Sequence, residues 1–227
     1  DEANAALVYE KAAIALDVAG GEDPVADGAP DGRYIPLVSN SRSLYHVRST
    51  DAQGVQARKD VEQVTSAPRT PMPDYILAAS KYYLDKRSEA VALIGKARAL
   101  PESRYDNAFL SATIRDENGK AYAPDNPSRY LRVSRQFMRL MALAAWVDAE
   151  EGRTADAVAK VRDDLAIARS IAGDPCLGSL LTSMALTTVT AKMALPRVLA
   201  RTNPSNADLA ALENDMGVPL FQRHARG

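Results

Sequence analysis

Apolar side chains recur at helical spacing over most of the chain, and they predict a protein built from helices. In residues 3–18, Leu7, Ile14 and Val18 share one face with alanines packed between them. The same kind of pattern, closed by proline or glycine, predicts helices along the rest of the chain: residues 51–64, 74–85, 88–100, 129–151, 154–172, 176–200 with a bend near Pro196, and 206–215.

Composition supports this interpretation. The 227 residues include about 40 alanines, while aromatic residues make up only 6%, a balance that favours helix over sheet. We therefore predict one all-α domain over residues 1–227, a bundle of stacked antiparallel helical hairpins. Residues 128–215 form its main helical-hairpin core, and residues 19–73 form an irregular, loop-rich cover.

The most informative segment joins two of the predicted helices through a glycine turn. Gly152 follows the helix that ends at Glu151, and Thr154 caps the next one. On that second helix Val158, Val161 and Leu165 lie on one face. We expect the two helices to pack antiparallel and to bury this face together with Trp146. Beyond Met141 the apolar residues spread around the helix axis, which places this half of the first helix at the centre of the fold.

The segment from Ala149 to Ala157, with Gly152 at its turn, resembles a tetratricopeptide-type hairpin. Residues 89–101, with Pro101 at the end, match the second helix of such a repeat, and residues 5–12 match more weakly. Ala90 and Ala157 lie 67 residues apart, close to two repeat lengths of about 34 residues. The chain departs from the repeat pattern in the long connection 101–127 and at Asp164, where a small residue is typical.

A second resemblance covers the whole chain. Asn4 to Ala12, then Ala99-Leu100-Pro101 with Arg104-Tyr105, and finally the Gly152 hairpin occur in the order seen in an uncharacterised, exported, all-helical bacterial family. The resemblance implies an exported (periplasmic or extracellular) helical protein whose signal peptide has been removed, and it implies no catalytic residues. It also suggests that the natural chain continues past Gly227.

Charge is distributed unevenly. Residues 1–31 contain eight acidic residues against one lysine and carry −7, so the remaining chain carries +6. Neither value approaches the basic charge of a nucleic-acid-binding protein, and we predict no such partner. Four arginines form a stripe on one side of the helix 129–151: Arg129, Arg132, Arg135 and Arg139. This arginine stripe either pairs internally with acids of residues 1–31 or with Asp156, Asp163 and Asp164, or it binds an anionic partner.

Enzyme motifs are scarce. With one cysteine and two histidines the sequence predicts no metal site and no cofactor. Cys176 is interpreted as a structural thiol, and the uncharged stretch 175–191 as a buried helix rather than a membrane span, because it is short and rich in hydroxyl groups. Arg104 and Tyr105, in the connection 101–127, are the preferred site candidates beside the arginine stripe.

These observations favour a non-catalytic scaffold that binds a protein or peptide partner. The alternative is a hydrolase-like or small-ligand-binding enzyme that uses the connection 101–127, with His46, Arg104 and acids from residues 116–125. An enzyme needs His46 within hydrogen-bonding reach of a carboxylate in a pocket, whereas a scaffold needs an open helical surface. The oligomeric state does not follow from the sequence.

Overall fold

The computed structural model describes residues 4–19, 52–100, 103, 129–173 and 177–217. Of these residues 85% are helical, and none of them forms a β-strand. The first half contains α1 (Ala5–Ala19), α2 (Ala52–Ser66), α3 (Asp74–Asp85) and α4 (Ser88–Ala97). The second half contains α6 (Arg129–Glu150), α7 (Thr154–Ala172), α8 (Leu177–Val189), the π-helical turn η1 (Thr190–Ala194), α9 (Leu195–Arg201) and α10 (Asn206–Gly217). The predicted all-α class is confirmed.

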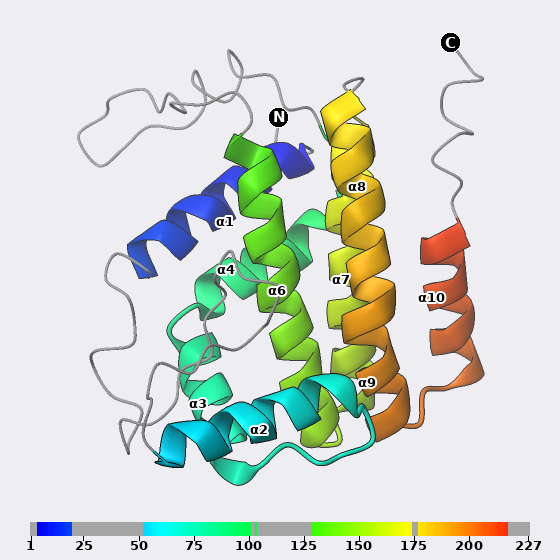
Figure 1. The fold of residues 1–227 in the computed structure, drawn as a ribbon. Coiled ribbons are helices and arrows are strands. Elements are labelled where there is room, and N and C mark those ends of the chain that lie inside the picture. Colours follow the sequence, from blue (N-terminus) through cyan, green and yellow to red (C-terminus); the bar gives the residue numbers. More distant parts are fainter. Residues whose placement is uncertain (1–3, 20–51, 101–102, 104–128, 174–176, 218–227) are drawn as a thin grey trace.

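The helices α6 and α7 form an antiparallel hairpin at the centre of the molecule (Figure 1). Every residue from Leu140 to Val147 is buried, so this half of α6 is enclosed on all sides. Trp146 and the three predicted contact residues of α7 are each at most 2% exposed: Val158, Val161 and Leu165. The prediction for this hairpin is confirmed.

The turn between these helices depends on Gly152, whose φ of +74° lies in the left-handed region. The amides of Gly152 and Arg153 donate to the carbonyls of Ala149 and Asp148, at 3.2 and 2.8 Å. This is the Schellman arrangement that commonly ends a helix at glycine. The expected cap is wrong: Arg153 occupies the N-cap position of α7 without a side-chain cap bond, and Thr154 is the first helical residue.

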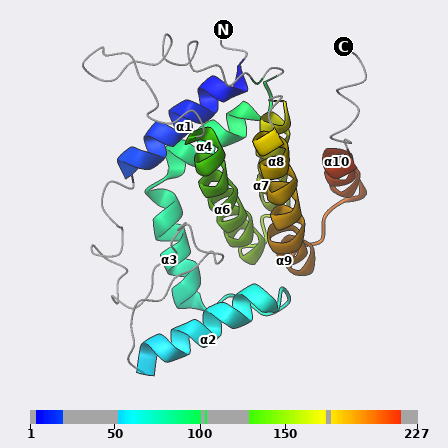
Figure 2. The same cartoon turned by 45° about the horizontal axis from the view of Figure 1, so that its top comes forward.

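The other helices surround this pair (Figures 1 and 2). On the α7 side lie α8 and α10, and α9 contacts both α6 and α7. On the other side α3 packs against α6, and α1 packs mainly along α4 although about 80 residues separate them in sequence. The rings of Tyr9 and Phe137 lie 6.0 Å apart and connect α1 to α6.

In place of the predicted bend near Pro196, the π-helical turn η1 ends two residues before that proline. Proline lacks an amide hydrogen and its ring crowds the carbonyl one turn earlier, so a regular α-helix cannot continue through it. The wider π turn removes that conflict and lets α9 continue almost in line with α8.

The uncharged helix α8 differs from the expected buried helix. Its buried residues include Ser179, Thr182 and Ser183, whereas Leu177 and Leu181 are 70% and 57% exposed. The small hydroxyl side chains allow a close approach to the neighbouring helix, and the Ser183 hydroxyl donates to the carbonyl of Ala168 at 2.7 Å. Among the described helices none combines the length and apolar character that a membrane span requires.

Within the predicted cover 19–73, residues 52–66 form α2, and residues 20–51 lie outside the described part. One buried arginine attaches the connection between α2 and α3 to the bundle. The Arg197 guanidinium donates to the carbonyls of Val64 and Thr70 at 2.7 and 3.0 Å and to the Glu150 carboxylate at 2.6 Å. It also lies 5.1 Å from the centre of the Trp146 ring. Nothing in the sequence pattern marks Arg197 for this role.

Candidate functional site

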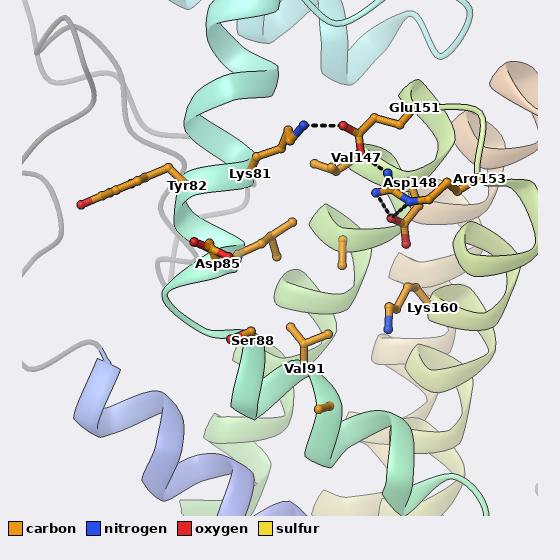
Figure 3. Close-up of a pocket in the computed structure, with 13 residues that line it drawn as sticks. Lys81, Tyr82, Asp85, Ser88, Val91, Val147, Asp148, Glu151, Arg153 and Lys160 are labelled. Atoms are coloured by element: carbon orange, nitrogen blue, oxygen red, sulfur yellow. Dashed lines mark hydrogen bonds and ion pairs between the residues drawn. The ribbon is translucent and has the colours of Figure 1, made fainter.

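A cavity of about 630 Å³ opens to solvent between α3, α4, α6 and α7. Figure 3 shows it as a cleft with α3 and α4 on one side and the α6–α7 hairpin on the other. Five apolar side chains form its floor: Leu84, Val91, Ala92, Ala144 and Val147. We call this cavity the cleft.

The floor of the cleft is apolar because an apolar face of α4 and an apolar face of α6 both line it. Val91 and Ala92 lie on the side of α4 that remains open after Ala90 and Ile94 have entered the core. Ala144 and Val147 lie one turn apart on α6. The small side chain of Ala144 leaves volume that a larger residue would occupy.

Four charged side chains form a continuous chain along one edge of the cleft (Figure 3). Lys81 on α3 pairs with Glu151 at 2.5 Å. Arg153, in the hairpin turn, then pairs with both Glu151 and Asp148. Its Nε atom donates to Oδ1 of Asp148 at 3.0 Å. This edge therefore contains two positive and two negative groups that neutralise one another.

The two carboxylates of this edge have their pKa values moved in opposite directions. The hydrogen bond from Lys81 lowers the pKa of Glu151 below its usual value. Burial raises the pKa of Asp148, although the hydrogen bond and charge of Arg153 oppose that effect. Only 12% of the Asp148 side chain is exposed, against 21% for Glu151.

Two further charges line the cleft and are not neutralised in this way. Lys160, half-buried on α7, and Asp85, exposed at the end of α3, form no hydrogen bond or ion pair with any described residue. In Figure 3 they stand on opposite sides of the apolar floor. Burial raises the pKa of Asp163 as it does that of Asp148, and the positive charge of Lys160 opposes the increase in both without reversing it.

The structure describes only part of the arginine stripe. Arg129 and Arg132 lie on α6, but their side chains are outside the described part, as are Arg104 and Tyr105. Arg135 is exposed, and Arg139 is half-buried, with a buried Nη1 atom that forms no hydrogen bond with any described residue. Burial, and secondarily the charge of Arg135, lowers the pKa of Arg139.

For the two described arginines of the stripe, Arg135 and Arg139, no ion pair with an acid of α7 is seen among the described residues, and for Arg129 and Arg132 this pairing stays a prediction. Asp156 lies 3.9 Å from Arg153, and Asp163 lies 3.0 Å from Arg98 of α4. Asp164 faces the other way and accepts a hydrogen bond from Thr190 of η1 at 3.2 Å. These acids are engaged by other elements because α7 is surrounded. The acids of residues 22–31 lie outside the described part, so the rest of the pairing hypothesis stays a prediction.

His46, Cys176 and the acids of residues 116–125 also lie outside the described part. No group of three or more potential metal ligands occurs among the described residues. No sequence motif marks the residues of the cleft. The one sequence signal that points to it is Asp148, an acidic residue inside the long apolar run Met141–Ala149. Comparison with family models, with curated proteins and with solved structures gives no match.

Proposed function

We propose that this protein is a non-catalytic binding module that holds a short peptide segment of a partner protein in the cleft. The observation that carries the proposal is the apolar floor open to solvent between helices of a packed bundle. A cavity of about 630 Å³ lies in the range of sites that enclose small ligands. It therefore fits a few side chains of a segment better than a broad protein surface.

The fixed charges along the edge support the same function. Packing of α3 against α6 and of α6 against α7 fixes the walls of the cleft, and the ion pairs along its edge connect α3 to the hairpin turn, so the cleft exists before a ligand arrives. Such preorganisation reduces the entropy lost on binding. The mutual neutralisation also means that an apolar side chain meets no unpaired charge along this edge of the cleft.

Two finer features belong to this proposal. We regard the α6–α7 hairpin as a tetratricopeptide-like unit, supported by its Gly152 turn and its buried contact face. Export of the protein rests on the sequence resemblance described above. The enzymatic alternative relies on His46, Arg104 and residues 116–125, for which the described part of the chain provides no geometry.

The proposal is tested by selecting a displayed library of random linear heptapeptides against the purified protein. A fluorescein-labelled peptide with the enriched sequence is then titrated by fluorescence anisotropy. Ala92 is exposed on α4 and lines the cleft, so Ala92→Trp should fill it without disturbing the core. We expect this variant to weaken binding at least tenfold, which is about 1.4 kcal/mol.

The matched control is Ala78→Trp, at an exposed position of α3 outside the cleft, which should bind like the wild type. If no peptide is enriched, or if Ala92→Trp binds the enriched peptide as well as the control, the proposed function is wrong. Mass spectrometry after prolonged incubation should recover the peptide intact. Cleavage of the peptide would overturn the non-catalytic assignment.

A further inference from the structure

The pattern of paired and unpaired charges around the cleft indicates which peptide segments it accepts. On its edge, Lys81, Glu151, Arg153 and Asp148 already satisfy one another. An incoming charged group gains little from them, because it would first have to break an existing ion pair. The charges of Lys160 and Asp85 are different, since no described residue pairs with either.

Lys160 has acidic neighbours, and their geometry explains why it remains available. Asp148 and Asp163 are near enough for the charge of Lys160 to oppose the increase that burial causes in their pKa values. Asp148, however, is bonded by Arg153, and Asp163 lies 3.0 Å from the Arg98 guanidinium. The Lys160 ammonium, carried on α7 at the side of the cleft, is thus the group left to meet a negative charge from outside (Figure 3).

Asp85 has the complementary position. It lies at the C-terminal end of α3, on the far side of the apolar floor from Lys160 in Figure 3. The nearby cation Lys86 lies 5.4 Å from the centre of the Tyr82 ring and forms no ion pair with Asp85. In Figure 3 Val91 of the floor lies between the sides that carry Asp85 and Lys160, and Ala144 lines the same cavity.

We infer that the cleft selects peptide segments in which an acidic and a basic side chain flank an apolar one. The acidic side chain pairs with Lys160, the basic side chain pairs with Asp85, and the apolar side chain covers Val91 and Ala144. This inference rests on the proposed function and gives it a ligand class. Charge complementarity of this kind determines specificity more than affinity, because it excludes segments that place like charges together.

The enriched heptapeptides from the selection provide the first test. Most of them should contain one acidic and one basic residue with at least one large apolar residue between them. Lys160→Gln and Asp85→Asn should each weaken the consensus peptide by roughly tenfold, equivalent to about 1.4 kcal/mol. Lys96→Gln and Glu213→Gln alter exposed charges that do not line the cleft and should leave binding unchanged.

A double-mutant cycle shows whether Lys160 and the acid of the peptide meet directly. Replacing that acid by glutamine should weaken binding of the peptide to the wild type by roughly tenfold. The same replacement should hardly change binding of the peptide to Lys160→Gln. Lys160→Arg keeps the positive charge and should retain the preference. Circular dichroism of each variant should match the wild type, so that unfolding is not mistaken for lost binding.

The outcomes separate the two proposals. Suppose that Ala92→Trp abolishes binding but the enriched peptides show no charge pattern, or that replacing the peptide acid weakens binding equally to the wild type and to Lys160→Gln. In either case the cleft binds peptides, and the inferred specificity is wrong. If Ala92→Trp has no effect, the proposed function itself fails. A tenfold coupling between Lys160 and the peptide acid, absent at Lys96, supports both.

Discussion

Glu150 and Glu151 follow one another at the end of α6, yet their carboxylates lie in opposite surroundings. The side chain of Glu150 is 4% exposed and lies 2.6 Å from Arg197 and 3.1 Å from Arg201. It also accepts a hydrogen bond from the Met72 amide at 3.3 Å. The side chain of Glu151 is 21% exposed and pairs with Lys81 and Arg153 at the cleft. Successive helical residues point about 100° apart, which places one carboxylate inside and the other at the edge.

The comparison shows that the contribution of a Glu–Arg or Glu–Lys pair to stability depends on how deeply the pair is buried, and not on which residues form it. At Glu151 water solvates either partner once the pair is broken, so the pair contributes little to stability. At Glu150 the Arg197 guanidinium is 1% exposed, and losing the carboxylate would leave a buried charge without its counter-charge. The buried group therefore fixes the fold, while the exposed group shapes a surface.

Glu150→Gln should produce the largest effect of the variants that probe this contrast. It keeps the shape of the side chain but leaves Arg197 facing a neutral amide, so we expect a loss of about 3 kcal/mol in the free energy of unfolding. Urea denaturation followed by circular dichroism measures this loss. A loss below about 1 kcal/mol would mean that the buried pair behaves like a surface pair, and the comparison would fail.

Asp164 is a buried acid that has no cationic partner among the described residues, and it extends the comparison to a single charge. It is fully buried, and no described residue forms a hydrogen bond with its Oδ1 atom. Thr190 Oγ1 lies 3.2 Å from Oδ2 of Asp164 and 3.1 Å from the carbonyl of Leu186. The Thr190 hydroxyl is the donor to Asp164, and this bond opposes the effect of burial on the pKa only in part. Burial raises the pKa of Asp164 well above its usual value.

Because the pKa of Asp164 is higher in the folded than in the unfolded state, the folded protein keeps a proton that the unfolded chain releases. Stability from this group is therefore present below pH about 4 and is lost as the pH rises above it. Asp164→Asn removes this dependence, and we expect it to stabilise the protein by at least about 1 kcal/mol at pH 7. Urea denaturation of the variant and the wild type at pH 3 and pH 7 provides the measurement. An equal difference at both pH values would contradict the assignment.

Glu151→Gln should produce the smallest effect. It removes the acceptor shared by Lys81 and Arg153, both of which can turn to water, so the loss should be at most about 1 kcal/mol. The pKa of Glu151 is lowered by Lys81, so this small contribution is present above pH about 4 and fades as the pH falls. It should also shrink in 1 M NaCl, because salt screens exposed pairs. The same denaturation assay measures both quantities, and a loss as large as that of Glu150→Gln would remove the distinction.

The α6–α7 hairpin could be predicted because its signals are local. The apolar face of Val158, Val161 and Leu165 and the turn at Gly152 can be read within about 20 residues of sequence, and both are confirmed. The capping box that begins α10 is local too. Ser205 and Asp208 exchange hydrogen bonds there, with the Ser205 hydroxyl accepting from the Asp208 amide at 3.1 Å.

The cleft and the buried charges could not be predicted, because they depend on contacts between distant segments. Lys81 meets Glu151 across 70 residues, and Arg197 meets Val64 across 133. In the sequence Arg197 resembles any arginine near a helix end, and Glu150 cannot be distinguished from Glu151. Asp163 and Asp164 occur in a charged stretch that is typical of a solvated helix face, yet α4 and η1 cover them.

The contact between Arg197 and the carbonyl of Val64 also imposes an order of events during synthesis. Ribosomes add about 5–20 residues per second, so the guanidinium emerges roughly 7–27 s after the carbonyl that it will bind. During that interval α2 lacks this contact with α9, and only nearer segments can hold it, such as α3, whose Tyr75 hydroxyl donates to Asp60 at 2.7 Å. The attachment of α2 to the bundle is therefore completed only after translation has passed α9.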